Sequence, residues 1–389
     1  MITPHIKSGH EATQPVAVEG ARAGDAIVIK IKKVTVVAAA SSSGTSQKVE
    51  GRKFPKGPFI LARCSQCGAE SPETVLIGIG PGAIRCKNCG AEAIPMNMLC
   101  GYTMVFDDEK TLGITVGKQQ AEEIASKAKE YAMLPANSTQ HPVLILAKAD
   151  LPGILSRVRP FVGNVGTTPA IDMSASHNCG DMLRRDLGQY LKESAERGEV
   201  PVNAVTDAHM DIDSVREGAT LICPVKVDGA GVYLADVHAM QGDGEIAGHT
   251  TDVSAEVTVE VKVIKGLTIE GPILLPPVED LPLLARPFSK GEVEKGRRMA
   301  KRWGVELEEV APIQVIGSGA DLNAATLNAL ERTAKLLDMG LDEVKNRATI
   351  TGSIEIGRAP GIVTASLLAP VKRLARLGIL DLVKEQYGL

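Results

Sequence analysis

The sequence lacks any long hydrophobic run. No stretch of about 18 consecutive apolar residues occurs, which argues against a membrane-spanning helix. The first seven residues, Met1 to Lys7, lack the basic and apolar regions of a secretory signal. We therefore expect a cytoplasmic protein with no membrane partner.

An excess of positive charge is also missing. The chain has 43 Lys and Arg against 47 Asp and Glu, for a formal net charge of −4, so a nucleic-acid partner is not expected. A hydrophobic content of 44% with 23% charged residues is typical of a globular protein. A length of 389 residues allows two or three domains. These features leave an enzyme or a protein-binding module.

Potential metal ligands and proton carriers are concentrated in one segment, residues 235–245. It follows a predicted strand, Thr220–Leu234, that is broken by glycines at 229 and 231. If the strand continues, Asp236 and His238 leave the same face, as two ligands of one ion would.

Two glycines in this segment, Gly242 and Gly244, permit a tight turn that would present Asp243 and Glu245 to the same space. The alternative is an ordinary turn with solvated carboxylates. The upstream Asp236 and His238 favour the functional interpretation.

A second polar segment lies about 25 residues earlier. In residues 207–213 a histidine and three aspartates alternate with other residues, so a strand would show them all on one face. His209 and Asp211 would suit a divalent cation such as zinc. Taken alone, an edge strand with a wet face explains the pattern equally well. Together with residues 235–245 it forms the other half of one predicted site.

These segments resemble the acetamidase/formamidase family of metal-dependent amide hydrolases. The family motif Gly-Asp-x-His-x-x-Gln-Gly-Asp-Gly-Glu is matched from Asp236 onward, and only Ala235 differs. The segments 161–169, 319–322 and 351–357 are also similar to the family. The resemblance covers most of the chain and implies the fold, a small-molecule amide substrate, and a homodimer or higher homo-oligomer.

Two positions depart from the family pattern. Its His-Gly-Gly-Asn-Met-Asp motif falls on residues 206–211, where Thr206 replaces the leading histidine and His209 replaces the asparagine. Its later Ala-Ile-Glu aligns with residues 250–252, where Asp252 is one methylene shorter than glutamate. The resemblance therefore supports the family fold more strongly than it supports a particular substrate.

Four cysteines predict a separate structural metal site. Two Cys-x-x-Cys-Gly knuckles lie 18 residues apart, which suits a closed tetrahedral zinc site; the ligands are Cys64, Cys67, Cys86 and Cys89. A disulfide framework is the alternative, and a reducing compartment argues against it. The family does not usually carry such a ribbon, so we interpret residues 61–95 as an insert.

The insert is a poor candidate for nucleic-acid binding. Its only basic residues are Arg63, Arg85 and Lys87, and it has no aromatic residue on which a base could stack. A covering or partner-docking role is expected instead.

The remaining pattern predicts strands first and helices later. Strands are expected at 26–37 and 253–264, a loop at 38–56, and helices at 119–133, 181–197, 290–303, 322–337, 341–346 and 370–386. No internal repeat is expected. The predicted fold class is α+β: a β-rich, sandwich-like catalytic body (1–60 and 96–271), the zinc-ribbon insert (61–95) and a mixed α/β C-terminal part (272–389).

Two weaker features are not assigned to the predicted site. His177 and Cys179 precede the predicted helix at 181, where a thiol pKa would be lowered; helix capping is the more ordinary explanation. The Gly317-Ser-Gly319 segment lacks the residues that would make it a phosphate loop.

The predicted function is hydrolysis of a small linear or cyclic amide. His209, Asp211, Asp236 and His238 would bind one or two divalent cations, most simply zinc. Glu245 would act as the general base, Asp243 and Asp252 would orient ligands, and Gln241 or a glycine amide would donate to the oxyanion. A non-catalytic relative that binds proteins through the ribbon, or a metal-dependent lyase or decarboxylase, remains the alternative.

Overall fold

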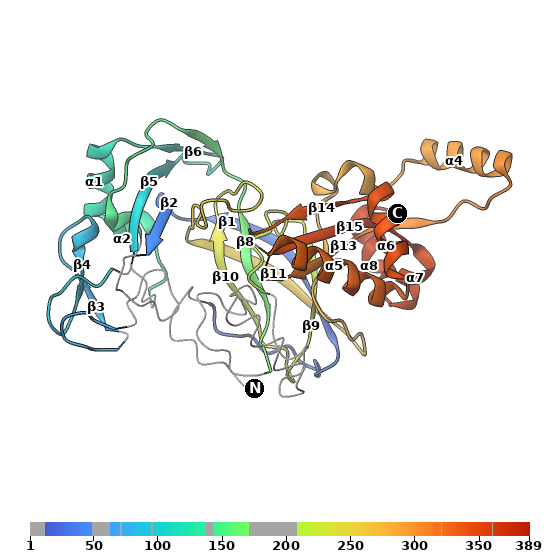
Figure 1. The fold of residues 1–389 in the computed structure, drawn as a ribbon, viewed down its shortest axis with the longest axis horizontal. Helices are drawn as coiled ribbons and strands as arrows, with labels where there is room; N and C mark the ends of the chain where they lie inside the picture. The colour runs from blue at the N-terminus through green and yellow to red at the C-terminus, as the bar shows by residue number, and fades with distance from the viewer. Residues whose placement is uncertain are drawn as a thin grey trace.

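The fold is α+β, as predicted. The computed structural model describes residues 12–48, 63–70, 72–94, 96–136, 143–170, 208–319, 321–359 and 361–389. These residues form four antiparallel sheets, with most of the helices in the C-terminal part (Figure 1). The predicted helix at 181–197, together with His177 and Cys179, lies outside the described residues.

The largest sheet has seven strands and joins the β-rich part of the chain to the C-terminal part. Its order is β11 (Ala255–Ile264), β1 (Ala26–Val36), β9 (Thr220–Pro224), β12 (Ile273–Leu275), β13 (Val310–Ser318), β15 (Ile362–Pro370) and β14 (Ser353–Ile356). Runs of β-branched residues explain β1 and β11, which pair along their length. The sheet continues past residue 272, where a domain boundary was expected, so that boundary remains a prediction.

A second layer makes the body sandwich-like. The paired strands β8 (Phe161–Thr167) and β10 (Val232–His238) pack their valines against the β1 and β9 side of the large sheet. The shared core includes Ile27, Ile29 and Leu221 with Val162 and Val165. This layer carries two of the predicted metal ligands to one end of β10.

A third sheet lies on the opposite side of the molecule from the C-terminal helices (Figure 1). Its order is β2 (Ala40–Lys48), β5 (Met96–Phe106), β6 (Leu112–Thr115) and β7 (Leu155–Arg157). It is covered by α1 (Lys118–Ser126), α2 (Ala128–Ala132) and the short 3-10 helix η2 (Val143–Leu146). The helix expected at 119–133 is confirmed as this pair, with a break at Lys127.

The loop expected at 38–56 is wrong for residues 40–48, which form β2. The strand can be polar and still pack in the fold because its hydroxyl groups form hydrogen bonds with neighbouring segments. Ser41 donates to the backbone carbonyl of Asp252, and Ser42 pairs with Thr103. A loop was expected because the serines of β2 give it the composition of a loop.

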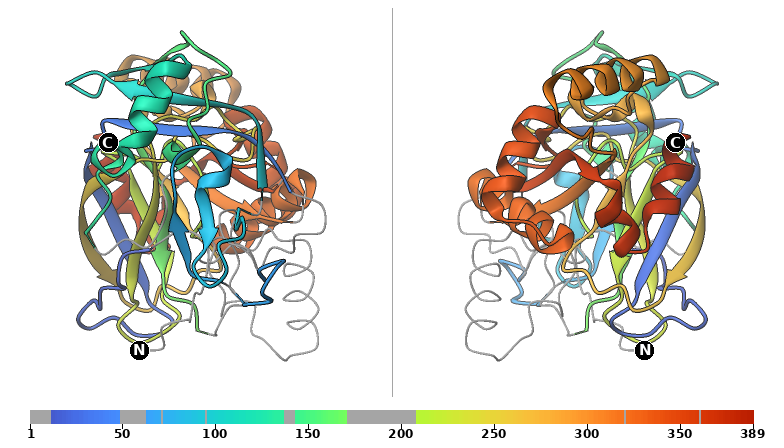
Figure 2. Two further views of the ribbon diagram at one scale, coloured as in Figure 1. Left: turned by 90° about the vertical axis from the view of Figure 1, so that its left-hand side faces the viewer. Right: turned by 90° about the vertical axis from the view of Figure 1, so that its right-hand side faces the viewer.

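The C-terminal part consists of helices packed on the end of the large sheet. The helices α5 (Leu322–Leu337) and α6 (Leu341–Thr351) cover β13 and β15, and α7 (Val371–Arg376) and α8 (Leu380–Tyr387) complete that end (Figure 2). The single helix expected at 370–386 is two helices, because Gly378 adopts a φ of 72° after α7.

Helix α4 (Lys290–Trp303) has the predicted bounds and projects from the rest of the chain (Figure 1). Ser289 and Glu292 form a reciprocal capping box at its start, and left-handed Gly304 ends it. Among the described residues, no helix is both long and apolar enough to cross a bilayer.

Candidate active site

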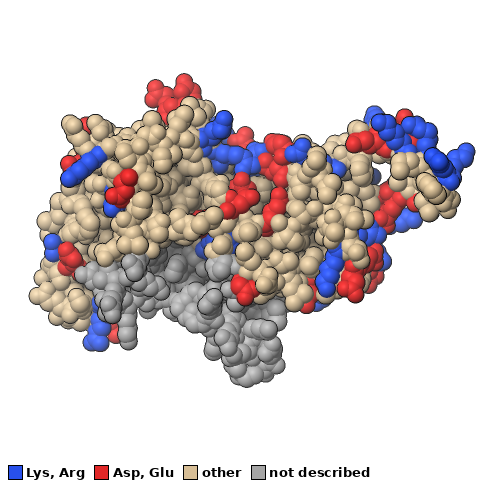
Figure 3. Space-filling model, turned by 45° about the horizontal axis from the view of Figure 1, so that its top comes forward, with Lys and Arg blue, Asp and Glu red and all other residues tan. Residues whose placement is uncertain are grey.

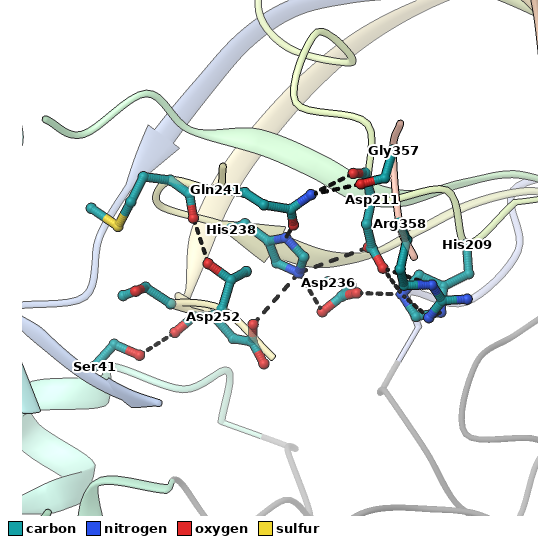
Figure 4. Close-up of polar contacts among 12 residues, drawn as sticks. Ser41, His209, Asp211, Asp236, His238, Gln241, Asp252, Gly357 and Arg358 are labelled. Carbon is teal, nitrogen blue, oxygen red and sulfur yellow. Dashed lines mark hydrogen bonds and ion pairs between the residues drawn. The ribbon is translucent and has the colours of Figure 1, made fainter. Parts of the chain in front are cut away.

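The predicted ligands converge where β8 and β10 meet three loops. Isolated bridges join Asn164 to His209, His238 to Asp252, and Gly244 to Arg358. Segments that are far apart in the chain thus surround one cluster of imidazoles and carboxylates (Figure 4). The structure brings together His209, Asp211, Asp236 and His238, as the sequence predicted.

His209 and Asp211 do not lie on a regular strand, so residues 208–213 do not have the strand geometry that the alternating pattern suggested. Asp211 adopts a φ of 48°, and the amides of Met210 and Asp211 both donate to the carbonyl of Gly163 at 2.9 and 3.1 Å. This turn directs the Asp211 side chain toward Asp236. Asp213, the third aspartate of the pattern, points elsewhere and pairs with Arg159 at 2.6 Å.

The cluster contains two overlapping sets of ligand-type atoms. His209 Nε2 lies 2.9 Å from an oxygen of Asp211 and 2.9 Å from an oxygen of Asp236. His238 Nε2 lies 3.2 Å from the other oxygen of Asp236 and 3.5 Å from Asp252 Oδ1. Asp236 belongs to both sets, so its carboxylate could bridge two cations.

The residues fit a divalent cation on two further grounds. Both oxygens of Asp211 are buried, and the groups that face them are the side chains of His209, His238 and Arg358, so the buried carboxylate depends on positive charge beside it. A Cβ at Gly163 would lie 2.5 Å from Asp211 Oδ1 and 3.2 Å from Asp236 Oδ2. Glycine at this position therefore leaves room for the two carboxylates.

Gln241 fixes the orientation of the His238 ring. The Gln241 amide nitrogen donates to the carbonyls of Asp211 and Gly357 at 2.6 and 3.2 Å, so its oxygen faces His238 Nδ1 at 3.0 Å. An Nδ1 proton donated there leaves Nε2 as the coordinating nitrogen. Because the Gln241 donors are already used, the expected oxyanion role gives way to a positioning role.

The carboxylates keep both histidines protonated while no cation is bound. Burial and the charge of Arg358 lower the pKa of His209, but Asp211 and Asp236 outweigh them and raise it to about 9. Burial also lowers the pKa of His238, and the charges of Asp236, Asp211 and Asp252 raise it well above the ordinary value. A cation must displace these protons to bind.

Glu245 is the buried carboxyl group beside the cluster. Gly244, with a φ of 89°, makes the turn that the sequence predicted, and Glu245 itself adopts a φ of 43°. Burial, followed by the charge of Asp211, raises the pKa of Glu245 to about 8, although His238 and Arg358 oppose the shift. A pKa near neutral is the property that a general acid–base group requires.

The other two predicted carboxylates occupy different positions. Asp252 is half-exposed and faces His238, so it stands among the candidate ligands rather than behind them. Asp243 is exposed. After burial, its charge is the largest cause that raises the pKa of Glu355, to about 7. Its charge also raises the pKa of Asp213, and Asp243 belongs to neither ligand set.

Arg358 is the site residue that sequence reasoning missed. Its guanidinium lies 3.4 Å from Asp211 Oδ2 and 3.2 Å from His209 Nδ1, and its side chain is largely buried. The only signal was its place directly after the family-like segment 351–357. Nothing in that local pattern indicates that a residue 149 positions after His209 contacts it.

The four cysteines predicted to bind zinc also converge. The sulfurs of Cys64 and Cys89 are 3.5 Å apart, and those of Cys67 and Cys86 are 3.8 Å apart. All four lie close enough to bind one ion, and none is in a disulfide. Backbone amides of Cys67 and Gln66 lower the pKa of Cys64 to about 6, which favours the thiolate that a metal requires.

The two cysteine knuckles are near copies of each other. Residues 63–70 and 85–92 both read Arg-Cys-x-x-Cys-Gly-Ala-Glu. In each, the glycine is left-handed, and the arginine and glutamate form an isolated bridge. The expectation of no internal repeat was therefore wrong at this scale. The strands β3 (Thr74–Leu76) and β4 (Ile84–Cys86) connect them, and a 3-10 turn, η1 (Pro81–Ala83), precedes β4.

Comparison with known proteins identifies a family. Residues 1–372 match the Acetamidase/Formamidase family. A predicted formamidase of Schizosaccharomyces pombe is 31% identical over 86 residues, and this match spans 21% of each chain.

Two solved structures align with most of this chain. A predicted acetamidase/formamidase from Thermoanaerobacter tengcongensis aligns with a TM-score of 0.49 and 20% identity, covering 97% of this chain and 79% of the other. An acetamidase from Yersinia enterocolitica aligns with a TM-score of 0.49 and 16% identity, covering 92% and 73%. The family match over residues 1–372 is the stronger finding.

Proposed function

The chain belongs to the acetamidase/formamidase family, and from this premise we propose that it hydrolyses the amide bond of a small molecule with the help of one or two divalent cations. The observation that carries the proposal is the pair of overlapping ligand sets that share Asp236, with Glu245 buried beside them. His209, Asp211 and Asp236 would hold one cation, and Asp236, His238 and Asp252 a second.

When bound, the cations would supply Lewis acidity that lowers the pKa of a water molecule and polarises the amide carbonyl. The protein contributes the geometry around them. Gln241 keeps the His238 ring in one orientation through its bond to Nδ1. Gly163 lets Asp211 and Asp236 approach each other.

Glu245 would take the proton from the attacking water and return it to the nitrogen of the departing amine or ammonia. Protonation is needed because an amide nitrogen is a poor leaving group. Burial gives Glu245 a raised pKa of about 8 in the cation-free site, and a nearby cation would lower it toward neutrality. A group poised in this range can serve as base first and as acid afterwards.

The displaced histidine favours an enzyme over a non-catalytic relative. His209, which stands where the family has asparagine, lies 2.9 Å from both Asp211 and Asp236. It therefore supplies an imidazole to the cluster despite the loss of histidine at position 206.

We further propose that Cys64, Cys67, Cys86 and Cys89 bind a structural zinc ion. Four thiolates leave no open position for a substrate. Reduced thiols require a reducing compartment, so we place the protein in the cytoplasm.

The experiment that tests the function combines metal analysis with an amide panel. We expect purified protein to carry more than one equivalent of metal and to release ammonia from formamide, acetamide or a related small amide. Activity should disappear after chelation and return when zinc, manganese or cobalt is added. Protein that carries metal and hydrolyses no amide in the panel, linear or cyclic, would contradict the proposal.

A further inference from the structure

Arg358 lies next to one of the two candidate cation sites. The first site is the set His209, Asp211 and Asp236, and the second site is the set Asp236, His238 and Asp252. We propose that Arg358 makes these sites unequal, so that the second site fills first and the first site fills only at a higher cation concentration. The inference rests on the proposed cation-binding role of both sets, and it concerns the order in which they are occupied.

The Arg358 guanidinium contacts two of the three ligands of the first site. Its Nε lies 3.4 Å from Asp211 Oδ2, the oxygen that is also 2.9 Å from His209 Nε2. Its Nη1 lies 3.2 Å from His209 Nδ1 and 3.4 Å from His209 Nε2 (Figure 4). Because Nη1 is almost equally distant from the two ring nitrogens, it lies along the lone pair of neither. The contact therefore places a positive charge beside the imidazole without the geometry of a regular hydrogen bond.

Solvent screens this charge poorly. The side chain of Arg358 is 12% exposed, and those of His209 and Asp211 are 3% and 1% exposed. The basic side chains of α4, by contrast, are all exposed at one end of the molecule (Figure 3), where water and salt weaken their effect. A buried guanidinium in contact with Asp211 lowers the affinity of that carboxylate for a divalent cation, because the two positive charges repel each other.

The backbone holds the base of the Arg358 side chain beside the first site. On one side of it, the amide of Ala359 donates to the carbonyl of Gly244 at 2.9 Å. On the other side, a Cβ at Gly357 would lie 2.8 Å from the carbonyl oxygen of Met210. This segment therefore packs directly against the turn that carries the first site, and the guanidinium stays close to that turn.

The second site has an uncharged support and an opening to solvent. His238 Nδ1 faces the side-chain oxygen of Gln241 at 3.0 Å, which leaves Nε2 for a cation. The side chain of Asp252 is 47% exposed, so a cation can reach it from solvent. Because Asp236 belongs to both sites, a cation in the second site adds its own repulsion to that of Arg358. The first site then binds its cation against two neighbouring positive charges.

The test follows the binding of Mn²⁺ to the full chain after a chelator has removed the cations of the active site. Mn²⁺ prefers carboxylate oxygen to thiolate sulfur, so the four cysteines do not interfere. Electron paramagnetic resonance counts the bound ions and detects the spin coupling of two ions that share a carboxylate. For wild type we expect two binding steps, with dissociation constants at least about tenfold apart, and spin coupling only in the second step. His209→Ala should keep the tighter step and lose the weaker one.

Variants of Arg358 test the cause of the difference. Arg358→Met removes the charge and keeps a long side chain, and we expect it to tighten the weaker step at least about tenfold. Arg358→Lys keeps the charge and should keep the difference between the steps. Arg347→Met is the matched control, because Arg347 pairs with Glu308 and Glu343 and its loss changes the net charge equally. Both steps should remain as in wild type in this control.

Three results would overturn the inference: a wild type that binds one ion, or two ions with equal affinity; a His209→Ala protein that loses the tighter step; and an Arg358→Met protein whose weaker step does not tighten. In the last case, a raised KM for the amide would assign Arg358 to the substrate instead. Arg358→Gln repeats the measurement if Arg358→Met does not fold. Binding is measured without hydrolysis, so a protein that shows the two steps and hydrolyses no amide would contradict the proposed function alone.

Discussion

At the scale of single residues, Gly163 determines how closely the two central carboxylates can approach. The Cβ of an alanine would lie 2.5 Å from Asp211 Oδ1, so the turn at Asp211 would have to move. We expect Gly163→Ala to weaken binding of the active-site cation at least tenfold, measured by titration of metal-free protein. Gly242→Ala is the control, because a Cβ there meets no atom within 4 Å. Equal affinities in both variants would mean that the cation does not lie between Asp211 and Asp236.

His209 tests whether a histidine at a new position has taken over as a ligand. We expect His209→Ala to lose one active-site metal equivalent in elemental analysis, because its imidazole lies 2.9 Å from Asp211 and Asp236. His249→Ala provides a matched control, since His249 bonds to Ser46 and belongs to neither ligand set. A full metal complement in folded His209→Ala would restrict this residue to the wall of the site.

Single residues also show what the sequence could and could not predict. The spacing of Asp236 and His238, and the glycine at 244, were sufficient to predict a cluster with Glu245. Two local motifs could not predict the position of Arg358, because its contact with His209 joins residues 149 positions apart. The hydrogen bonds that use both Gln241 donors were equally invisible, since their acceptors are backbone carbonyls of distant residues.

At the scale of elements, the sequence predicted strands and helices correctly where the residue pattern alternates regularly or contains clear helix caps. The alternating valines of β11 and the caps of α4 gave correct elements. The serine-rich β2 was missed because its composition does not reveal the hydrogen bonds that its hydroxyl groups form inside the fold. These bonds join Ser41 to the backbone carbonyl of Asp252 and Ser42 to Thr103. The alternation at 207–213 suggested a strand, whereas residues 208–213 are irregular and carry His209 and Asp211 into the site.

The cysteine insert is an element whose metal can be separated from the catalytic one. Replacing Cys64 and Cys86 by Ser should release about one zinc per chain, because two thiolates bind far more weakly than four. We expect faster hydrogen exchange in residues 63–94 and an unchanged complement at the active site. Loss of every metal, or of none, would show that the two sites are not independent.

At the scale of the whole molecule, metal binding should be linked to protons. The pKa of His209 is raised from 6.5 to about 9 in the cation-free protein. A raised pKa stabilises the fold below the unfolded value, and that contribution is lost as pH rises through the folded value. The pKa of Glu245, raised from 4.5 to about 8, acts in the same direction.

The melting temperature of the chelated protein should therefore fall between pH 6.5 and 9. The loaded protein has already released these protons, so the stabilisation gained on adding zinc should grow over the same range. Differential scanning calorimetry with and without chelator measures both quantities. A zinc-induced increase that stays constant with pH would contradict the assigned protonation of the cluster.

The whole fold followed from sequence only in outline. The family resemblance and the element pattern gave an α+β body. The joining of β12, β13 and β15 to the strands of the body in one sheet depends on pairing between residues far apart in the sequence, such as Ile273 with Ile222 and Val310 with Pro370. Local propensity carries no information on such pairing, so the predicted division at residue 272 did not anticipate the continuous sheet.

The most direct measurement of the central claim compares wild type with Glu245→Gln on an amide that wild type hydrolyses. Glutamine keeps the size of the side chain but cannot accept a proton at neutral pH. We expect the rate of ammonia release to fall by a factor on the order of 10² to 10⁴, while metal content and melting temperature remain close to wild type. A Glu245→Gln protein that keeps its metals and hydrolyses the amide at the wild-type rate would contradict the account.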